Sequence, residues 1–220
     1  MFKRVFQLFK IARKLASSGA IDTINEIYSI PFSIKIFFDL FSIGTNKNNL
    51  TISKKPGEKL CDALQGMGTT FIKLGQFLAT RPDIIGEEVT DYLVKLQDKL
   101  PAFNTVVAKK IIKDELGEAQ FNNILNLSEP IAAASIAQVH IAKIKINNET
   151  KDVAIKILRP DIEKLFNEEL DALMLFAYIV ESLLPKAKRL KLIEVVHLLR
   201  EITNIEMDLR FEAAAANELF

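Results

Sequence analysis

Residues 130–140 read PIAAASIAQVH, and residues 153–156 read VAIK. These stretches predict a strand, a tight loop, a second strand, a turn and a third strand. In the second strand apolar and polar residues alternate with one slip, which is typical of a half-buried strand; the apolar positions are Val139, Ile141, Ile144 and Ile146. Residues 147–149 are Asn-Asn-Glu and predict the turn, because asparagine tolerates positive φ.

One lysine lies in the third predicted strand. Lys156 shares a face of that strand with Ala154 and Leu158, while β-branched residues occupy the other face. We expect Lys156 to be buried and to have an anionic partner, because an unpaired buried ammonium group is costly. The alternative interpretation is a surface strand with a lysine that extends its charge into water.

An upstream segment, residues 71–83, reads FIKLGQFLATRPD. Lys73, Gln76 and Thr80 fall at i, i+3 and i+7, so they share one face of a predicted helix. An ordinary amphipathic helix in water gives the same pattern, so this segment alone indicates no particular function.

A third segment, residues 205–217, reads IEMDLRFEAAAAN. Glu206 and Arg210 are spaced i, i+4 and predict an ion pair within one helix. Asp208 and Glu212 have the same spacing and would repel each other. An uncompensated carboxylate pair indicates that a lysine or a metal ion comes from elsewhere, although charge runs are usually solvated helix faces.

Taken in this order, the three segments resemble those of the UbiB family, atypical kinase-like proteins linked to ubiquinone biosynthesis. The resemblance runs from about Ile21 to the last residue, and its alanine-rich loop takes the place of the glycine loop of a kinase. The matching motifs are the KxGQ motif at Lys73-Leu74-Gly75-Gln76, the loop at 132–140, the strand lysine Lys156, the ExD motif Glu206-Met207-Asp208 and the paired glutamate Glu212. One departure is Ala215, where family members commonly carry asparagine.

The resemblance implies an α+β fold, with a protein-kinase-like N-lobe of three or more antiparallel strands, a large helical N-terminal extension and no C-lobe. The implied nucleotide-binding residues are Ala132, Ala133, Ala134, Ser135, Ile136, Ala137, Gln138, Val139 and Lys156. The implied regulatory residues are Lys73, Gly75, Gln76, Glu206, Asp208 and Glu212, with Lys73 paired to Glu206 in the nucleotide cleft.

The same resemblance implies ATP or ADP as the cofactor, with Mg²⁺ in a complete family member. The chain contains neither His-Arg-Asp nor Asp-Phe-Gly, which supply the base and a metal ligand in kinases. We therefore expect no catalytic base and no metal ligand in this chain, and nucleotide binding that is weak or absent.

The expected domains are a basic, Phe-rich helical lead over 1–60 with a loop at 44–49, a helical extension with the KxGQ motif over 61–127, and the N-lobe over 128–220. The expected helices include 104–118 with Asn104 as its N-cap, 160–184, and one long final helix over 191–220. Lys156 and Glu212 lie 56 residues apart, which implies an inserted helical hairpin between them.

Composition excludes some functional classes. A net charge of +1 predicts no nucleic-acid partner, and the single cysteine, Cys61, excludes an internal disulfide framework. We expect no transmembrane helix. Residues 1–20 predict a basic amphipathic helix on an anionic bilayer, which suggests peripheral attachment at the cytoplasmic face of the inner (plasma) membrane. A helix packed against its own domain is the alternative.

Two classes of function remain open from the sequence. The first is a truncated UbiB-like atypical kinase or ATPase component that supports ubiquinone biosynthesis, with a membrane surface or lipid precursor of ubiquinone and a possible separate C-terminal lobe as partners. The second is a non-catalytic remnant or a scaffold that binds membrane or partner proteins. An unrelated all-helical lipid-binding protein is disfavoured by the three predicted strands.

Overall fold

The computed structural model describes residues 2–17, 25, 54–96, 100–147, 149–183 and 185–219. The chain divides into two compact units, which we call the helical unit (Met1–Gln97 with Lys164–Asn204) and the sheet unit (Asp98–Glu163 with Ile205–Phe220). Each unit is therefore built from two separate stretches of the chain. The predicted loop at 44–49 lies outside the described residues.

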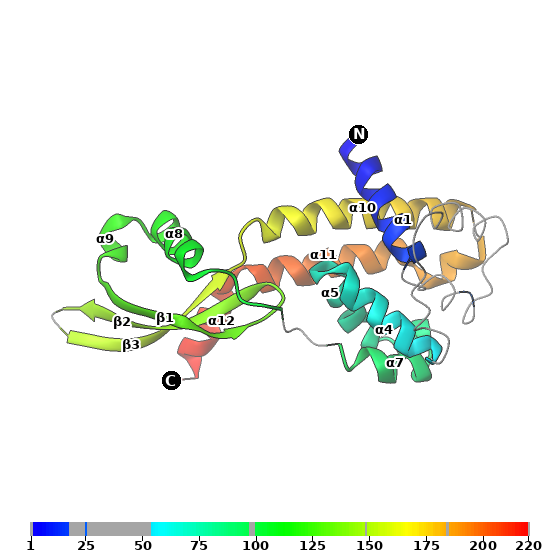
Figure 1. The fold of residues 1–220 in the computed structure, drawn as a ribbon. Coiled ribbons are helices and arrows are strands. Elements are labelled where there is room, and N and C mark those ends of the chain that lie inside the picture. The colour runs from blue at the N-terminus through cyan, green and yellow to red at the C-terminus, as the bar shows by residue number, and fades with distance from the viewer. Residues whose placement is uncertain are drawn as a thin grey trace. The chain divides into compact units, whose positions relative to one another are not determined.

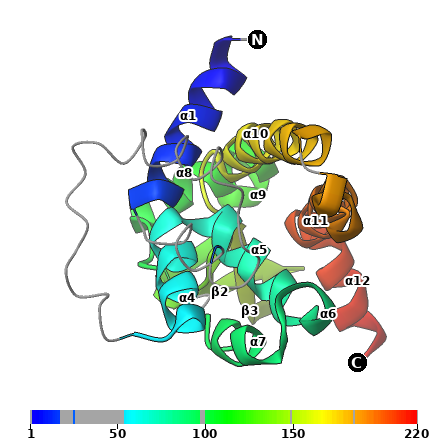
Figure 2. The ribbon, with the colours of Figure 1, turned by 90° about the vertical axis from the view of Figure 1, so that its right-hand side faces the viewer.

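The helical unit contains α1 (Phe2–Ser17), α4 (Pro56–Met67), α5 (Thr69–Ala79), α6 (Pro82–Ile85) and α7 (Glu87–Leu93), with nearly all of α10 (Ile162–Leu183), the 3₁₀ helix η2 (Pro185–Leu190) and most of α11 (Leu192–Met207). Helices α4, α5 and α7 pack together (Figure 2). Gly68 separates α4 from α5 at a φ of 107°, a backbone conformation that favours glycine.

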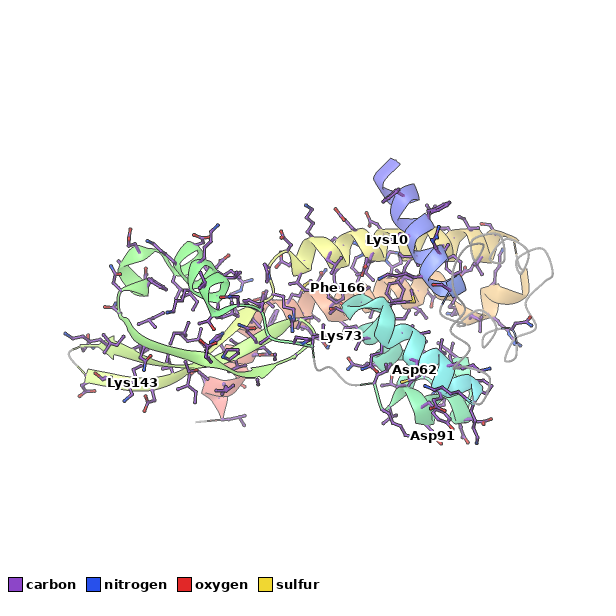
Figure 3. All side chains as sticks on the ribbon, in the orientation of Figure 1. Lys10, Asp62, Lys73, Asp91, Lys143 and Phe166 are labelled. Atoms are coloured by element: carbon purple, nitrogen blue, oxygen red, sulfur yellow. The ribbon has the colours of Figure 1, made fainter. Side chains whose placement is uncertain are left out.

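Helices α10 and α11 run side by side in the helical unit (Figures 1 and 2). The guanidinium of Arg200 donates to Asp171 at 2.8 Å, and the Glu181 carboxylate accepts from the backbone N–H of Ile193 at 3.1 Å. Phe166, labelled in Figure 3, points into the core of this unit from α10 and is fully buried. These contacts confirm a helical hairpin between Lys156 and Glu212.

The sheet unit contains α8 (Thr105–Leu116), α9 (Glu118–Phe121), β1 (Ile124–Ala133), β2 (Ala137–Ile146), β3 (Glu149–Leu158) and α12 (Leu209–Glu218). The three strands form one antiparallel sheet in the order β1-β2-β3 (Figure 1). Asn104 caps α8 by accepting a hydrogen bond from the Val106 N–H, as the sequence predicted. The predicted α+β fold with kinase-like strands and a helical extension is confirmed.

One face of the sheet is covered by α8. Ala108 and Ile112 of α8 are buried against Ile157 of β3, and Ile155 and Leu127 pack against this cluster. Strands β2 and β3 pair in unbroken register from Ala137↔Leu158 to Ile146↔Glu149. Since directly paired residues share a face, the core face of β2 is fixed by its pairing with Ile155 and Ile157.

The buried face of β2 differs from the one that its apolar residues predicted. Gln138, His140 and Ala142 are buried, whereas Ile141 is 46% exposed. The reason is that Gln138 pairs with Ile157 and His140 with Ile155, which places these polar side chains under α8. Their hydrogen bonds, described below, compensate for the burial.

The predicted final helix is interrupted at Asp208. Helix α11 ends at Met207 and α12 begins at Leu209, because Asp208 has a non-helical backbone and its carboxylate accepts a hydrogen bond from the Arg210 N–H. An aspartate at such a position satisfies a backbone donor that a helix start leaves unpaired. The prediction of one continuous helix over 191–220 is therefore wrong at this residue.

Gly75 lies in the middle of α5 and is buried in the helical unit. A Cβ atom at this position would collide with the side chains of Leu96 and Leu64, which are themselves buried. Gly66 in α4 is exposed and has no atom within 4 Å of the equivalent Cβ position. The two glycines therefore offer a matched comparison of the same substitution.

We expect Gly75→Ala to lower the free energy of unfolding by about 1–3 kcal/mol, because overpacking outweighs the gain in helix propensity. Gly66→Ala should instead raise it by up to about 1 kcal/mol. Urea unfolding followed by circular dichroism measures both changes. Equal effects of the two substitutions on the free energy of unfolding would contradict the inference that close packing against Leu96 and Leu64 requires glycine at position 75.

Candidate functional site

A short, closed loop joins β1 to β2. The backbone N–H of Ala134 donates to the carbonyl of Ala137 at 2.8 Å, which closes the turn. Ser135, Ile136 and Ala137 are buried, at 0%, 6% and 1% exposure. The loop is thus packed into the sheet unit.

Arg159, which follows β3, holds this loop. Its guanidinium donates to the carbonyl of Ala134 from Nε at 3.0 Å and from Nη2 at 2.7 Å. Its backbone N–H donates to the carbonyl of Ile136 at 2.8 Å. Two loop carbonyls are therefore bound by a single residue that the sequence analysis did not select.

The face of the sheet opposite α8 carries mostly apolar residues, several of which are exposed in the described part of the chain. On this face Lys156 pairs with Val139, Ala154 pairs with Ile141, and Ala132 pairs with Val139. Ala132, Ile141 and Ala154 are exposed. We call this set (Ala132, Val139, Ile141, Ala154 and Lys156) the open face. Ile141 and Ala154 were not among the predicted site residues, although alternation around Lys156 already placed Ala154 beside the lysine.

Lys156 is paired with Glu212 of α12. Its Nζ lies 2.6 Å from each of the two carboxylate oxygens, which confirms the predicted pair across 56 residues. The two side chains remain 34% and 54% exposed, so the prediction of a buried lysine is wrong. Within the described residues of the sheet unit, Lys156 is contacted on this face by Glu212 of α12, whereas α8 packs on the other face.

The remaining charges of the third segment are arranged differently from the sequence prediction. Because the helix breaks at Asp208, Arg210 bonds to Asp208, through Nε at 2.7 Å. Hydrogen bonds from Arg210 lower the pKa of the Asp208 carboxyl below its usual value. Asp208 and Glu212 therefore each have their own cation, and the lysine that the carboxylate spacing led us to expect from elsewhere is Lys156 of β3, bound to Glu212.

Two residues of the alanine-loop motif point away from the open face. The Gln138 amide accepts from the Phe103 N–H at 2.8 Å and donates to the Phe103 carbonyl at 3.2 Å. The Gln138 nitrogen also lies 2.8 Å from Nε2 of His140, whose Nδ1 lies 2.7 Å from the Ser128 carbonyl. Since a carbonyl only accepts, Nδ1 donates to the Ser128 carbonyl and Nε2 accepts from the Gln138 amide nitrogen.

The KxGQ motif lies on α5 in the helical unit. Lys73 and Gln76 are half-buried and Gly75 is buried (Figure 3 labels Lys73). Glu206 belongs to the sheet unit, so the predicted Lys73–Glu206 pair would join the two units and stays a prediction.

No cluster of three or more histidine, cysteine, aspartate or glutamate side chains in the described part of the chain is arranged to hold a metal ion. Among the helices described, none combines the length and hydropathy needed to cross a membrane.

Comparison with known proteins identifies relatives of this chain. Residues 95–220 match the ABC1 atypical kinase-like domain. A protein of Vibrio cholerae named "Probable protein kinase UbiB" is 41% identical over 174 residues, which cover 78% of this chain and 31% of the relative. A protein of the same name in Histophilus somni is 37% identical over 215 residues, covering 97% of this chain and 39% of the relative.

The chain thus spans only 31% and 39% of the length of these two curated relatives. No solved structure matches it. The family match covers the alanine loop, Lys156, Glu206, Asp208 and Glu212, while the relatives' alignments extend upstream toward the KxGQ motif.

The Lys156–Glu212 pair can be tested with a double-mutant cycle of Lys156→Met and Glu212→Gln. We expect a coupling free energy of about 1 kcal/mol or less, because both side chains are partly exposed. Urea unfolding of the four proteins at low and high salt gives this value. The Lys113–Glu118 pair of the same unit is the control and, being more exposed, should couple more weakly. A coupling free energy above about 3 kcal/mol would indicate a buried ion pair and would contradict the description of Lys156 and Glu212 as partly exposed.

Proposed function

Because the chain belongs to the ABC1 atypical kinase-like family, we propose that its alanine loop and open face bind ATP or ADP. The chain would then be the nucleotide-binding part of a kinase-like component that supports ubiquinone biosynthesis, the role that the UbiB name of its relatives suggests. The observation that carries the proposal is a lysine, fixed by a helix glutamate, on an uncovered apolar strand face beside a closed loop.

Each part of the open face fits one part of a nucleotide. Val139, Ile141 and Ala154 offer apolar area against which an adenine ring can lie. Lys156 supplies a positive charge for phosphate oxygens, and Glu212 orients its ammonium group. The predicted loop residues, Ala132 to Val139, would act mainly through backbone groups and methyl groups, since the Gln138 side chain is bound to Phe103.

The alanine loop supports a nucleotide preference that differs from that of a kinase. Glycine lets backbone N–H groups turn toward phosphates and close over them. Here methyl groups occupy the approach, and Arg159 fixes the carbonyl of Ala134. We therefore propose binding with weak or unconventional phosphoryl transfer, and a small molecule or ATP hydrolysis in place of a protein substrate.

Magnesium does not fit the described residues as they are arranged. Asp208 is bound to Arg210 and Glu212 to Lys156, so neither carboxylate is oriented for a metal ion. We derive no step through Mg²⁺ for this reason. We propose that phosphoryl transfer needs a further lobe that supplies a base and metal ligands, because these are what kinase chemistry requires.

The remaining predicted parts belong to the same proposal. Lys73, Gly75 and Gln76 would form a regulatory segment in which Lys73 pairs with Glu206 and restricts the cleft. The division into a lead (1–60), an extension (61–127) and an N-lobe (128–220) is the corresponding domain proposal. A non-catalytic remnant or scaffold is the alternative, and nucleotide binding separates the two.

We expect the chain to bind MgADP and Lys156→Met to weaken this binding at least about tenfold, through loss of a charged phosphate contact. Isothermal titration calorimetry measures both affinities, and Lys113→Met, an exposed lysine of α8, is the control. ATP hydrolysis by the chain should be no faster than that of Lys156→Ala. Unchanged MgADP affinity in Lys156→Met, or hydrolysis that Lys156→Ala abolishes, would contradict the proposal.

A second candidate function is attachment to an anionic membrane surface through α1. Ile11 and Ala12 are buried, so one side of α1 packs on its own unit. Phe6 and Phe9 are 70% and 52% exposed, and Lys10 (Figure 3) and Arg13 are exposed as well. Exposed aromatic and basic side chains on one helix suit the surface of an anionic bilayer. We propose peripheral attachment at the cytoplasmic face of the inner membrane, where a lipid precursor of ubiquinone would be found.

Replacement of Phe6 and Phe9 by serine should reduce binding to vesicles that contain an anionic lipid at least about tenfold, since burial of a Phe side chain is worth about 1.5–3 kcal/mol. Co-sedimentation measures the bound fraction. Val106→Ser, at a 73% exposed apolar residue of α8, is the control. Binding that survives the double substitution, or that is equal on neutral vesicles, would contradict the role of α1.

A further inference from the structure

The geometry points to Arg159 as a positioning residue that holds the alanine loop in its closed conformation. The Ala134 carbonyl receives two hydrogen bonds from the guanidinium, at 3.0 and 2.7 Å. Hydrogen bonds from a charged donor are roughly twice as strong as neutral ones. A loop held in this way keeps its peptide groups in one orientation.

The main chain of Arg159 adds a second attachment to the same loop. Its N–H donates to the Ile136 carbonyl at 2.8 Å, while the Ala134 N–H donates to the Ala137 carbonyl at 2.8 Å. The loop is therefore fixed at Ala134 and Ile136 by one residue and closed internally at Ala137. Among the attachments of the loop itself, substitution of the Arg159 side chain removes the one at Ala134 and leaves both backbone bonds in place.

The guanidinium of Arg159 also contacts the segment that precedes α8. Its Nη2 lies 3.3 Å from the Leu100 carbonyl, and its central carbon lies 6.0 Å from the centre of the Phe103 ring. The backbone of Phe103 is held in turn by Gln138. A planar guanidinium with several donors in a fixed geometry can serve two carbonyls and an aromatic ring together, an arrangement that the flexible, point-charge ammonium of lysine does not reproduce.

The consequence for ligands rests on the proposed function. If nucleotide phosphates approach the loop, Arg159 fixes the loop conformation before they bind, which lowers the ordering cost of binding. Its replacement should then weaken ligands that carry phosphates and leave adenosine, which lacks them, largely unaffected. A residue that only stabilised the fold would weaken both ligands alike.

The first experiment needs no nucleotide. Hydrogen–deuterium exchange of the chain, read by mass spectrometry, compares Arg159→Lys with Arg200→Lys, the same substitution at a part-buried arginine of the helical unit. In Arg159→Lys, amides of peptides covering residues 131–138 should exchange at least about tenfold faster, because the loop loses the guanidinium contact in which two donors reach the Ala134 carbonyl together. The amides of α8 should keep their protection, and Arg200→Lys should leave the loop unchanged.

Unchanged exchange of the loop in Arg159→Lys would overturn the inference. So would a joint loss of protection in the loop and α8, since Arg159 would then hold the whole unit and not the loop. In the second experiment, titration with MgADP and with adenosine should show a loss of at least about tenfold for MgADP and under about threefold for adenosine.

Equal losses for MgADP and adenosine would also overturn the positioning role. Failure of the unsubstituted chain to bind either ligand would contradict the proposed nucleotide site. In that case the exchange experiment still decides whether Arg159 positions the loop. The proposed nucleotide site and the positioning role of Arg159 can therefore be disproved independently.

Discussion

The hydrogen bonds between Gln138 and the backbone of Phe103 decide which face of the sheet is buried. Gln138 and His140 are polar, yet they lie under α8 because the Gln138 amide, the His140 ring and the main chain satisfy one another. A buried polar group without such partners would cost free energy comparable to a lost hydrogen bond or more. This network therefore allows the apolar side of β2 to remain uncovered.

The open face follows from that arrangement. In an antiparallel sheet, side chains alternate between faces, so burying Gln138 and His140 necessarily leaves Val139 and Ile141 on the other side. Lys156 lies on the same side by its pairing with Val139. One buried hydrogen-bond network thus leaves an apolar surface and a lysine on the same side of the sheet, next to the alanine loop.

The sequence predicted the helices and strands of the sheet unit better than it predicted which side chains of each strand are buried. The alternation of β3, the cap at Asn104 and the Lys156–Glu212 pair all follow from local spacing or from the family resemblance, and the structure agrees. Apolar alternation in β2 misled, because a strand with polar residues bonded to backbone cannot be distinguished from a surface strand by hydropathy alone. The break at Asp208 was missed for a related reason. An aspartate four residues before a glutamate reads equally well as a charged helix face and as a helix start, and only the backbone separates the two.

The sheet unit is assembled from chain segments that are separated by the residues of another unit, Lys164–Asn204. Strands β1 to β3 contact their sequence neighbours and can form early, whereas α12 must return across the whole insertion before Lys156 meets Glu212. Loop-closure entropy opposes such a return, and a formed α10–α11 hairpin shortens the flexible part of the loop. The ion pair of the open face therefore depends on closing a long loop that is made of residues of the other unit, so a connection in the chain links the two units although each has its own core.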